Sequence, residues 1–402
     1  MKQRSLLCAS LLTSLALPSS LLGQAPFFGP RSAGMAGAAT AVADDGTAVW
    51  TNPAGLARAE RMDLEIFGGG VATNRNGFTS IVDRLSSLDL KAVQAGDPAT
   101  IAKGLRDLNL LAQSGTGVVG SGAAGAVFGK SGLAVAIGDL GYAGVYPTID
   151  LVRIQPGSDP NTGLAFNQTG ISFAGLEARE VRVSYARSFF AKVLLLGGTA
   201  RYIAGRTYFV REGVFQVGDS DPVALAREAF KHNAENTSKF AFDLGAMVNI
   251  LGKARVGLVS TAINEPEFAV RNDPSDPTLF GAPKSIRLPR TLRAGLAIQP
   301  IGMLTIAADQ DLRETDTLLK GGKSKQLSLG AELKLPLFAV RAGAFRDASA
   351  PDPHWAYSAG FGLGLNLVSL NASVVFSSEG GLSLSSTNRR DVGAALDLRI
   401  KL

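Results

Sequence analysis

Cysteine is almost absent from the chain. The 402 residues contain one, Cys8, which lies in an apolar stretch near the N-terminus. We expect this stretch to be removed as an export signal, so the mature chain carries no thiol. Disulfide bonds and cysteine-based metal sites are therefore excluded.

Histidine is nearly as rare, and occurs only as His232 and His354. A metal site or a Ser–His catalytic centre would need one of the two, and neither lies in a pattern typical of such sites. We therefore expect no catalytic residue, no metal site and no cofactor. A hydrolase that uses one of these histidines stays open as an alternative.

Long apolar runs and surplus charge are also missing. Beyond residue 25, no stretch reaches the roughly 18 uninterrupted apolar residues that a membrane-spanning helix needs. The formal net charge of +6 falls to +4 without Lys2 and Arg4. This excess is small and scattered, so we expect no nucleic acid partner.

The first 25 residues have the pattern of a secretory signal. Lys2 and Arg4 give a basic start, Leu6 to Leu22 give a mostly apolar stretch, and small residues follow at 23–25. This order is typical of a signal peptide with its cleavage site. We assign residues 1–25 to the signal, which predicts an exported protein.

Alternation of apolar and polar residues dominates the rest of the chain. In 391–402 the apolar residues fall on even numbers, whereas Asp397, Arg399 and Lys401 fall on odd numbers. The same alternation occurs in 325–335 and 240–250. A period of two places successive side chains on opposite faces of a strand, and about ten residues suffice for a tilted strand to cross a bilayer.

Fourteen segments of this kind can be counted. They are 62–72, 117–129, 132–142, 175–188, 192–210, 240–250, 254–264, 290–298, 303–313, 325–335, 338–346, 355–365, 368–377 and 391–402. Long and short connections alternate strictly between them, as they do in transmembrane barrels. The sequence predicts an all-β fold, a transmembrane antiparallel β-barrel of about 14 strands over 61–402, with both termini in the periplasm.

Two of the long connections show helical spacing. The first covers 80–113, with breaks at Gly96 and Pro98, and the second covers about 221–236, where Asp221 and Pro222 suit a helix start. We expect both to be small helical insertions in the outer loops. Caps over the loops and a dedicated binding role remain alternatives.

Charged residues on the inner face should line the lumen. Their mixed signs predict a wall cross-linked by ion pairs, and Asp309 and Asp311, two residues apart, should share a face. A carboxylate pair can perform acid–base chemistry, but we expect a solvated wall. The residues expected inside are Asp63, Glu65, Arg201, Asp243, Arg293, Asp309, Asp311, Glu332, Lys334, Arg341, Asp397, Arg399 and Lys401.

The stretch GPRSAGMAGAATAVADDGTAVWTNPAGLA at 29–57 carries a family resemblance. It is similar to the mature N-terminus of the long-chain fatty-acid transporter (FadL/TodX) superfamily of outer-membrane proteins, which includes PorV-like and TraF-like relatives. The resemblance implies that 26–60 folds inside the barrel as a hatch. The matching residues are Gly34, Gly37, Asp44, Asp45, Asn52, Pro53, Ala54 and Leu56, with Trp50 as a bulky anchor. We expect Asp44 and Asp45 to pair with Arg201, Arg293 and Arg341.

Later stretches, such as SGLAVAIGDLGYAGV at 131–145 and the insertion after the first strand, resemble the TraF-like (conjugal transfer protein) branch. The superfamily resemblance implies a barrel in the outer membrane, in contact with its lipid, that binds or passes hydrophobic small molecules such as long-chain fatty acids. The alternative is a non-transporting barrel whose loops dock a secreted or transfer-apparatus protein.

Overall fold

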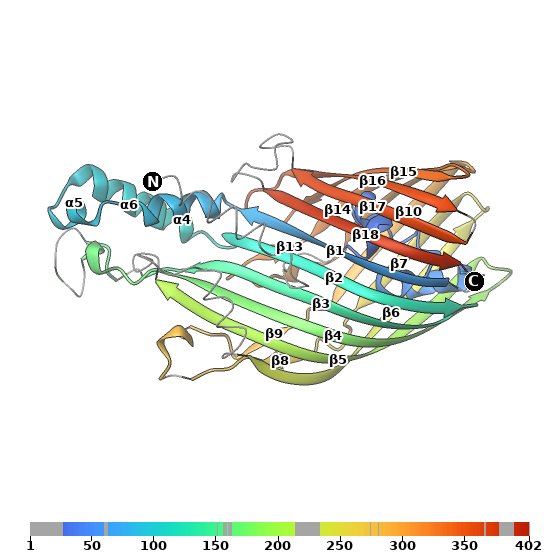
Figure 1. Ribbon diagram of the computed structural model, residues 1–402, viewed down its shortest axis with the longest axis horizontal. Coiled ribbons are helices and arrows are strands. Elements are labelled where there is room, and N and C mark those ends of the chain that lie inside the picture. Colours follow the sequence, from blue (N-terminus) through green and yellow to red (C-terminus); the bar gives the residue numbers. More distant parts are fainter. Residues whose placement is uncertain are drawn as a thin grey trace.

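Fourteen strands form one closed antiparallel barrel (Figure 1). The computed structural model describes residues 27–59, 63–150, 152–155, 159, 163–213, 234–273, 275–279, 281–365, 367–377 and 390–401. The barrel strands are β1 (Asp63–Arg75), β2 (Gly117–Lys130), β3 (Leu133–Thr148), β4 (Gly170–Phe189), β5 (Leu194–Gly213), β6 (Glu235–Ile250), β7 (Ala254–Thr261), β10 (Thr291–Ile301), β11 (Leu304–Asp311), β14 (Gln326–Lys334), β15 (Phe338–Asp347), β16 (Trp355–Leu365), β17 (Val368–Ser377) and β18 (Asp391–Lys401).

The barrel closes where the first strand meets the last. Every strand pairs with its neighbours along the chain, and β1 also pairs with β18, from Asp63 opposite Lys401 to Thr73 opposite Asp391. The predicted fold class and the count of fourteen strands are thus confirmed. The predicted lengths are too short for β4 and β6, which have 20 and 16 residues, because these strands continue past their strictly alternating stretches.

Apolar side chains cover the outside of the barrel. On β4, Val181, Val183 and Tyr185 are exposed, whereas their neighbours Arg182 and Ser184 are buried inside. A soluble barrel would place these two classes the other way round. An outward apolar band around a polar inner face is the arrangement of a barrel that spans a membrane.

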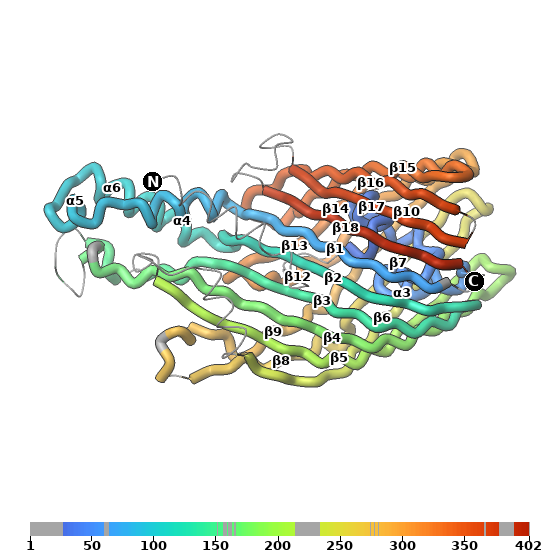
Figure 2. The backbone as a smooth tube through the Cα atoms, in the orientation of Figure 1, coloured from blue at the N-terminus to red at the C-terminus, as the bar shows by residue number. Residues whose placement is uncertain are grey.

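Long loops lie at one end of the barrel and short turns at the other, and β1 begins and β18 ends at the short-turn end (Figure 2). Near the N-terminus, the chain forms α2 (Gly29–Gly34), α3 (Ala48–Thr51) and the 3-10 helix η1 (Pro53–Arg58). The long loops contain α4 (Phe78–Ser86), α5 (Leu90–Gln94), α6 (Pro98–Leu111), η2 (Leu164–Phe166), β8 (Glu267–Ala269), η3 (Pro277–Leu279), β9 (Ser285–Arg287), β12 (Thr315–Asp316) and β13 (Lys323–Ser324).

Helices α4 to α6 occupy the range in which helical spacing was predicted. Asp89 caps α5 and Asp97 caps α6, each accepting hydrogen bonds from backbone N–H groups of the first turn. The helices share a small apolar core of their own and project beyond the strand ends (Figure 1). The second predicted helix lies outside the described residues, except that Glu235 and Asn236 belong to β6.

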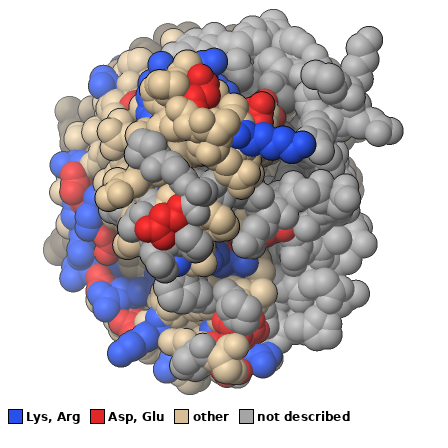
Figure 3. All heavy atoms as spheres, turned by 90° about the vertical axis from the view of Figure 1, so that its left-hand side faces the viewer, with Lys and Arg blue, Asp and Glu red and all other residues tan. Residues whose placement is uncertain are grey.

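Charges of both signs are mixed at the long-loop end. Figure 3 looks onto this end and shows Lys and Arg interspersed with Asp and Glu. Among the described residues, no helix combines the length and the apolar character needed to span a membrane.

Candidate functional site in the barrel lumen

Residues 27–58, here called the N-terminal segment, lie inside the barrel near the short-turn end (Figure 2). The segment packs against the wall at backbone distance, because glycines replace side chains where the two meet. A Cβ atom at any of eight wall glycines would lie within 3.1 Å of an atom of the segment. These glycines are Gly125, Gly197, Gly245, Gly257, Gly295, Gly330, Gly343 and Gly360.

The Asn52-Pro53-Ala54 turn fixes the path of the segment. The Asn52 side chain is fully buried, and its Nδ2 donates to the Thr40 carbonyl at 2.8 Å and to the Ala246 carbonyl of β6 at 3.3 Å. Its Oδ1 accepts from the Ala54 N–H at 3.1 Å and caps η1, in which Pro53 takes the first position. One side chain thereby joins two parts of the segment to the wall.

Trp50 is the aromatic anchor of the segment. Its ring meets Phe67 of β1 edge-to-face at 4.9 Å between centroids, and stacks on Phe28 at 6.2 Å. The guanidinium of Arg182 lies over the same ring, 5.5 Å from its centroid. Aromatic pairs and a cation–π contact of this kind each contribute about 0.5–2 kcal/mol.

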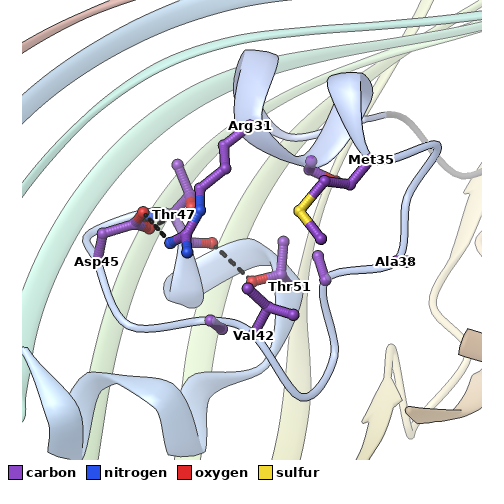
Figure 4. Close-up of a pocket in the computed structure, with 10 residues that line it drawn as sticks. Arg31, Met35, Ala38, Val42, Asp45, Thr47 and Thr51 are labelled. Carbon is purple, nitrogen blue, oxygen red and sulfur yellow. Dashed lines mark hydrogen bonds and ion pairs between the residues drawn. The ribbon is translucent and has the colours of Figure 1, made fainter. Parts of the chain in front are cut away.

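Arg31 joins the acidic pair of the segment to the wall, and Figure 4 shows its contact with Asp45. Its Nη1 lies 2.5 Å from Asp44 Oδ1 and 3.3 Å from Asp45 Oδ2. Its Nε and Nη2 donate to both carboxylate oxygens of Glu332 on β14, at 3.1 and 2.8 Å. Burial alone would raise the pKa of Asp44, but the guanidinium groups of Arg31 and Arg58 hold it well below its usual value.

The expected partners of Asp44 and Asp45 were therefore wrong. Arg201, Arg293 and Arg341 do not bind the acidic pair, because each of them already binds a wall carboxylate. Arg201 pairs with Glu180 and Asp243, Arg293 pairs with Asp309 and Asp311, and Arg341 pairs with Glu332. Arg31 from the segment itself, with Arg58 and Arg399, neutralises Asp44 and Asp45.

Two members of the wall network were not predicted. Glu180 and Arg182 of β4 are buried, and Arg182 Nε lies 2.6 Å from Glu180 Oε2. Arg182 also reaches Asp243 at 3.4 Å and donates to the Val49 carbonyl of the segment at 3.2 Å. The alternation in EVRVSYA at 180–186 would have placed both residues inside, since Val181 and Val183 face outward.

Asp309 and Asp311 share the inner face, as predicted, but the wall here is not solvated. Asp309 is buried, and its Oδ2 accepts hydrogen bonds from the backbone N–H groups of Ala39 and Thr40 at 3.0 and 2.8 Å. Arg293 bridges the two carboxylates and also donates to the Gly37 carbonyl at 3.3 Å. Asp309 and Arg293 thus hold the segment directly, whereas Asp311 binds Arg293 and the backbone N–H of Gln326 on the wall.

The remaining predicted lumen residues differ in their surroundings. Glu65 and Asp397 are buried, and Asn371 donates to Asp397 at 2.7 Å. Lys334 is exposed at the end of β14, and Arg399 and Lys401 are half-buried. The side chain of Asp63 lies outside the described residues.

A second element crosses the lumen at the long-loop end. Residues 312–325, here called the outer strap, leave β11 and reach β3 and β2, which lie six and seven strands away around the barrel. A Cβ atom added at Gly144 would lie only 2.8 Å from Leu318. A Cβ atom added at Gly117 would clash with Leu319 in the same way. The Gly115 N–H donates to the Lys320 carbonyl at 3.1 Å.

Arg75 fastens the outer strap. Its side chain is fully buried, donates to the Lys323 carbonyl at 2.9 Å, and forms a salt bridge with Asp347 at 2.6 Å. One apolar cluster extends from the N-terminal segment along the inner face of the wall to the strap. This cluster includes Trp50, Phe67, Leu140, Leu176, Phe209, Phe268 and Leu319.

Two small cavities lie beside these elements. The cavity in Figure 4, lined by Arg31, Met35 and Val42 among others, has a volume of about 20 Å³, and a second beneath His354 has about 10 Å³. Space of this size holds about one water molecule.

Residues 49–311, more than half of the chain, match the family described as F plasmid transfer operon, TraF, protein. The chain belongs to the TraF family. The match includes Trp50 and Asn52-Pro53-Ala54 but begins after the acidic pair. No curated protein matches the chain.

Solved structures share the fold of this TraF-family barrel. The Pseudomonas putida toluene transporter TodX aligns with a TM-score of 0.53 at 12% identity, over 94% of this chain and 99% of that one. The Ralstonia pickettii toluene transporter TbuX aligns with a TM-score of 0.53 at 14% identity, over 93% and 98%. The CymD monoaromatic hydrocarbon channel aligns with a TM-score of 0.52 at 14% identity, over 93% of this chain and 97% of that one. These likenesses show the fold that was predicted, and the family match confirms the predicted resemblance to the TraF-like branch.

His354 of the TraF-family barrel is held in place at both ring nitrogens. Its Nε2 lies 2.5 Å from Asp391 Oδ2, and its Nδ1 lies 2.9 Å from the Asp352 carbonyl. Thr73 donates to the other oxygen of Asp391 at 2.6 Å. Neither ring nitrogen of His354 is left to act as a base. In a hydrolytic triad the hydroxyl contacts the imidazole, whereas here the Thr73 hydroxyl contacts the Asp391 carboxylate, so the arrangement is not that of a triad.

His232 lies outside the described residues. Within the part of the chain that the structure describes, no group of three or more His, Cys, Asp or Glu side chains is arranged to hold a metal ion.

Proposed function

We propose that this TraF-family barrel passes hydrophobic small molecules across the outer membrane, and that the structure corresponds to its closed state. The observation that carries the proposal is the apolar cluster between the N-terminal segment and the outer strap. A pore for ions or sugars needs a polar, water-filled interior, whereas this lumen has an apolar middle compartment with a closure on each side.

The fold supports the same class of ligand. The barrels that it resembles are described as toluene transporters and monoaromatic hydrocarbon channels. The substrate class that we assign is therefore small hydrocarbons and long-chain fatty acids. The N-terminal segment acts as the hatch, the short turns face the periplasm, and the protein performs no chemistry on the ligand.

Uptake measurements test the transport proposal. Labelled toluene and labelled oleate are given to a strain that lacks the protein and to the same strain complemented with it. We expect faster uptake of at least one ligand in the complemented strain. Equal rates for both ligands, with the barrel present in the outer membrane, would rule out transport of these ligands and leave the fold unaffected.

Helices α4 to α6 favour a second candidate function. They form a separate apolar core and project past the strands into the space beyond the long loops (Figure 1). We propose as the alternative that this insertion docks a secreted or transfer-apparatus protein. A variant with residues 78–113 replaced by a short Gly/Ser linker is compared with the intact protein in pull-downs, and unchanged partners would contradict docking by the helices.

A further inference from the structure

The short turns end in exposed apolar side chains. Leu251 is 96% exposed and Phe190 is 77% exposed, and Met303, Leu337 and Leu367 are also exposed. They sit in five of the six short turns. Large apolar side chains at the tips of water-exposed turns are unfavourable unless a surface covers them.

The charged residues at the same turns are all positive. The six stretches 128–135, 187–195, 250–254, 298–305, 333–339 and 363–370 contain no Asp or Glu. They contain four exposed lysines, Lys130, Lys192, Lys253 and Lys334. Across the described residues, no salt bridge joins Lys130, Lys253 or Lys334 to a carboxylate. The long-loop end, in contrast, mixes both signs (Figure 3).

These side chains are distributed around most of the barrel. The short turns join β2 to β3, β4 to β5, β6 to β7, β10 to β11, β14 to β15 and β16 to β17, so six of the seven strand joints at this end carry one, and only the β18–β1 joint does not. The tips continue the outward apolar band, as the exposed Ile301, Phe338 and Leu365 beside them show. A protein that docks on one side would meet only part of this ring, whereas a lipid surface meets all of it.

We propose that this ring, here called the short-turn rim, binds anionic glycerophospholipids of the leaflet that it faces. The apolar tips enter the boundary between acyl chains and headgroups, and the lysine ammonium groups bind lipid phosphates. Lys192 and Lys253 each follow an apolar tip by two residues, and Lys334 precedes Leu337 by three. The short-turn rim thereby selects anionic boundary lipid and sets the depth of the barrel in the membrane.

This inference rests on the proposed membrane location but not on transport. The full-length mature protein is reconstituted into vesicles of phosphatidylcholine mixed with phosphatidylglycerol, and extracted in mild detergent. Native mass spectrometry then gives the ratio of the two lipids that remain bound. A shift in gel mobility on heating confirms the folded barrel in every sample, so failed insertion is separated from lost lipid preference.

Three variants isolate the short-turn rim. The first carries K130Q, K192Q, K253Q and K334Q, and the second replaces the same four lysines by arginine. The control carries K91Q, K103Q, K284Q and K320Q, which remove the same charge from exposed lysines at the long-loop end. Phosphatidylglycerol should be enriched on the wild type, the arginine variant and the control.

On the glutamine rim variant, we expect the enrichment to fall by at least about fivefold, the effect of one lysine at an anionic surface. Raising the salt concentration should weaken the enrichment on the wild type as well, because it screens the charges. Equal enrichment on the rim variant and the control would overturn the proposal. A wild-type protein that shows no preference between the two lipids would also overturn the proposal, and this includes the case in which the rim binds a periplasmic protein instead.

Discussion

Arg31 shows how a single residue holds the N-terminal segment together and to the wall. It contacts Asp44 and Asp45 within the segment and both oxygens of Glu332 on β14, and Glu332 also binds Arg341. Bidentate Arg–carboxylate geometry is among the stronger charged contacts in proteins. Partial burial strengthens it further, because screening by solvent is reduced.

His354 gives the long-loop end of the barrel a dependence on pH. The hydrogen bond to Asp391 raises the pKa of His354 above its ordinary value of about 6.5, although burial opposes the shift. Because the pKa of His354 is raised in the folded state, protonated His354 stabilises the fold, and this stabilisation is complete below about pH 6.5. The contribution is lost as the pH rises through the higher folded-state pKa.

We expect H354Q to weaken this contact by about 1.5–3 kcal/mol at low pH, as for a hydrogen bond to a charged group, and by less at high pH. Hydrogen exchange of residues 349–355 measures the effect in wild type and variant across the pH range. D391N should remove the pH dependence as well. A wild type whose local exchange protection does not fall at high pH, relative to H354Q, would contradict the assignment.

The inner polar residues could be predicted from the sequence, but most of their partners could not. Period-two alternation places Arg201, Asp243 and Glu332 on the inner face whatever the path of the rest of the chain. The partner of Asp44 depends on how the segment folds back on itself. Local patterns carry no information about a contact such as Arg31 to Glu332, which joins residues 301 positions apart.

At the scale of the element, glycines in the wall determine where the segment lies. At Gly257 an added Cβ would lie 2.6 Å from the Thr40 carbonyl oxygen and 3.2 Å from the Ala41 Cα. Both are backbone atoms, so the segment must shift to admit a methyl group. Overpacking of this kind costs about 1–3 kcal/mol.

G257A should therefore loosen the segment while the barrel stays intact. We expect hydrogen exchange in residues 38–44 to rise by about five- to a hundred-fold, the equivalent of that energy. G364A on β16 is the matched control, because its added methyl group would have no neighbour closer than 4.0 Å. Similar exchange in the two variants would show that the close contact at Gly257 does not hold the segment.

Strands long enough to cross a bilayer could be predicted, and the short ones could not. The fourteen barrel strands have 8–20 residues, over which alternation is visible. Strands β12 and β13 have two residues each, and β8 and β9 have three. A run of two or three residues has no period, so these elements form through contacts such as Phe268 against Gly205.

At the scale of the whole molecule, different chemistry occupies different levels of the barrel. A cationic and apolar rim is followed by an ion-paired belt around the N-terminal segment, an apolar compartment, and the outer strap held by Arg75. We propose that the segment and the strap act as two closures in series. A barrel of fourteen strands is too wide for its wall side chains alone to fill, so we expect both to contribute to sealing it.

Closures in series predict how deletions combine. With either closure removed, the other still limits the flow of ions, so deletion of residues 27–57 should raise the conductance in planar bilayers only modestly. Replacing residues 314–324 by a short Gly/Ser linker should have an equally modest effect. The double variant should show a conductance far above the sum of the two increases, approaching that of an open barrel of similar width.

The variant lacking residues 78–113 serves as the control and should conduct like the wild type, because the deleted helices lie outside the lumen. If deletion of the segment alone opened the pore fully, the outer strap would not be a closure, and the N-terminal segment would be the sole gate.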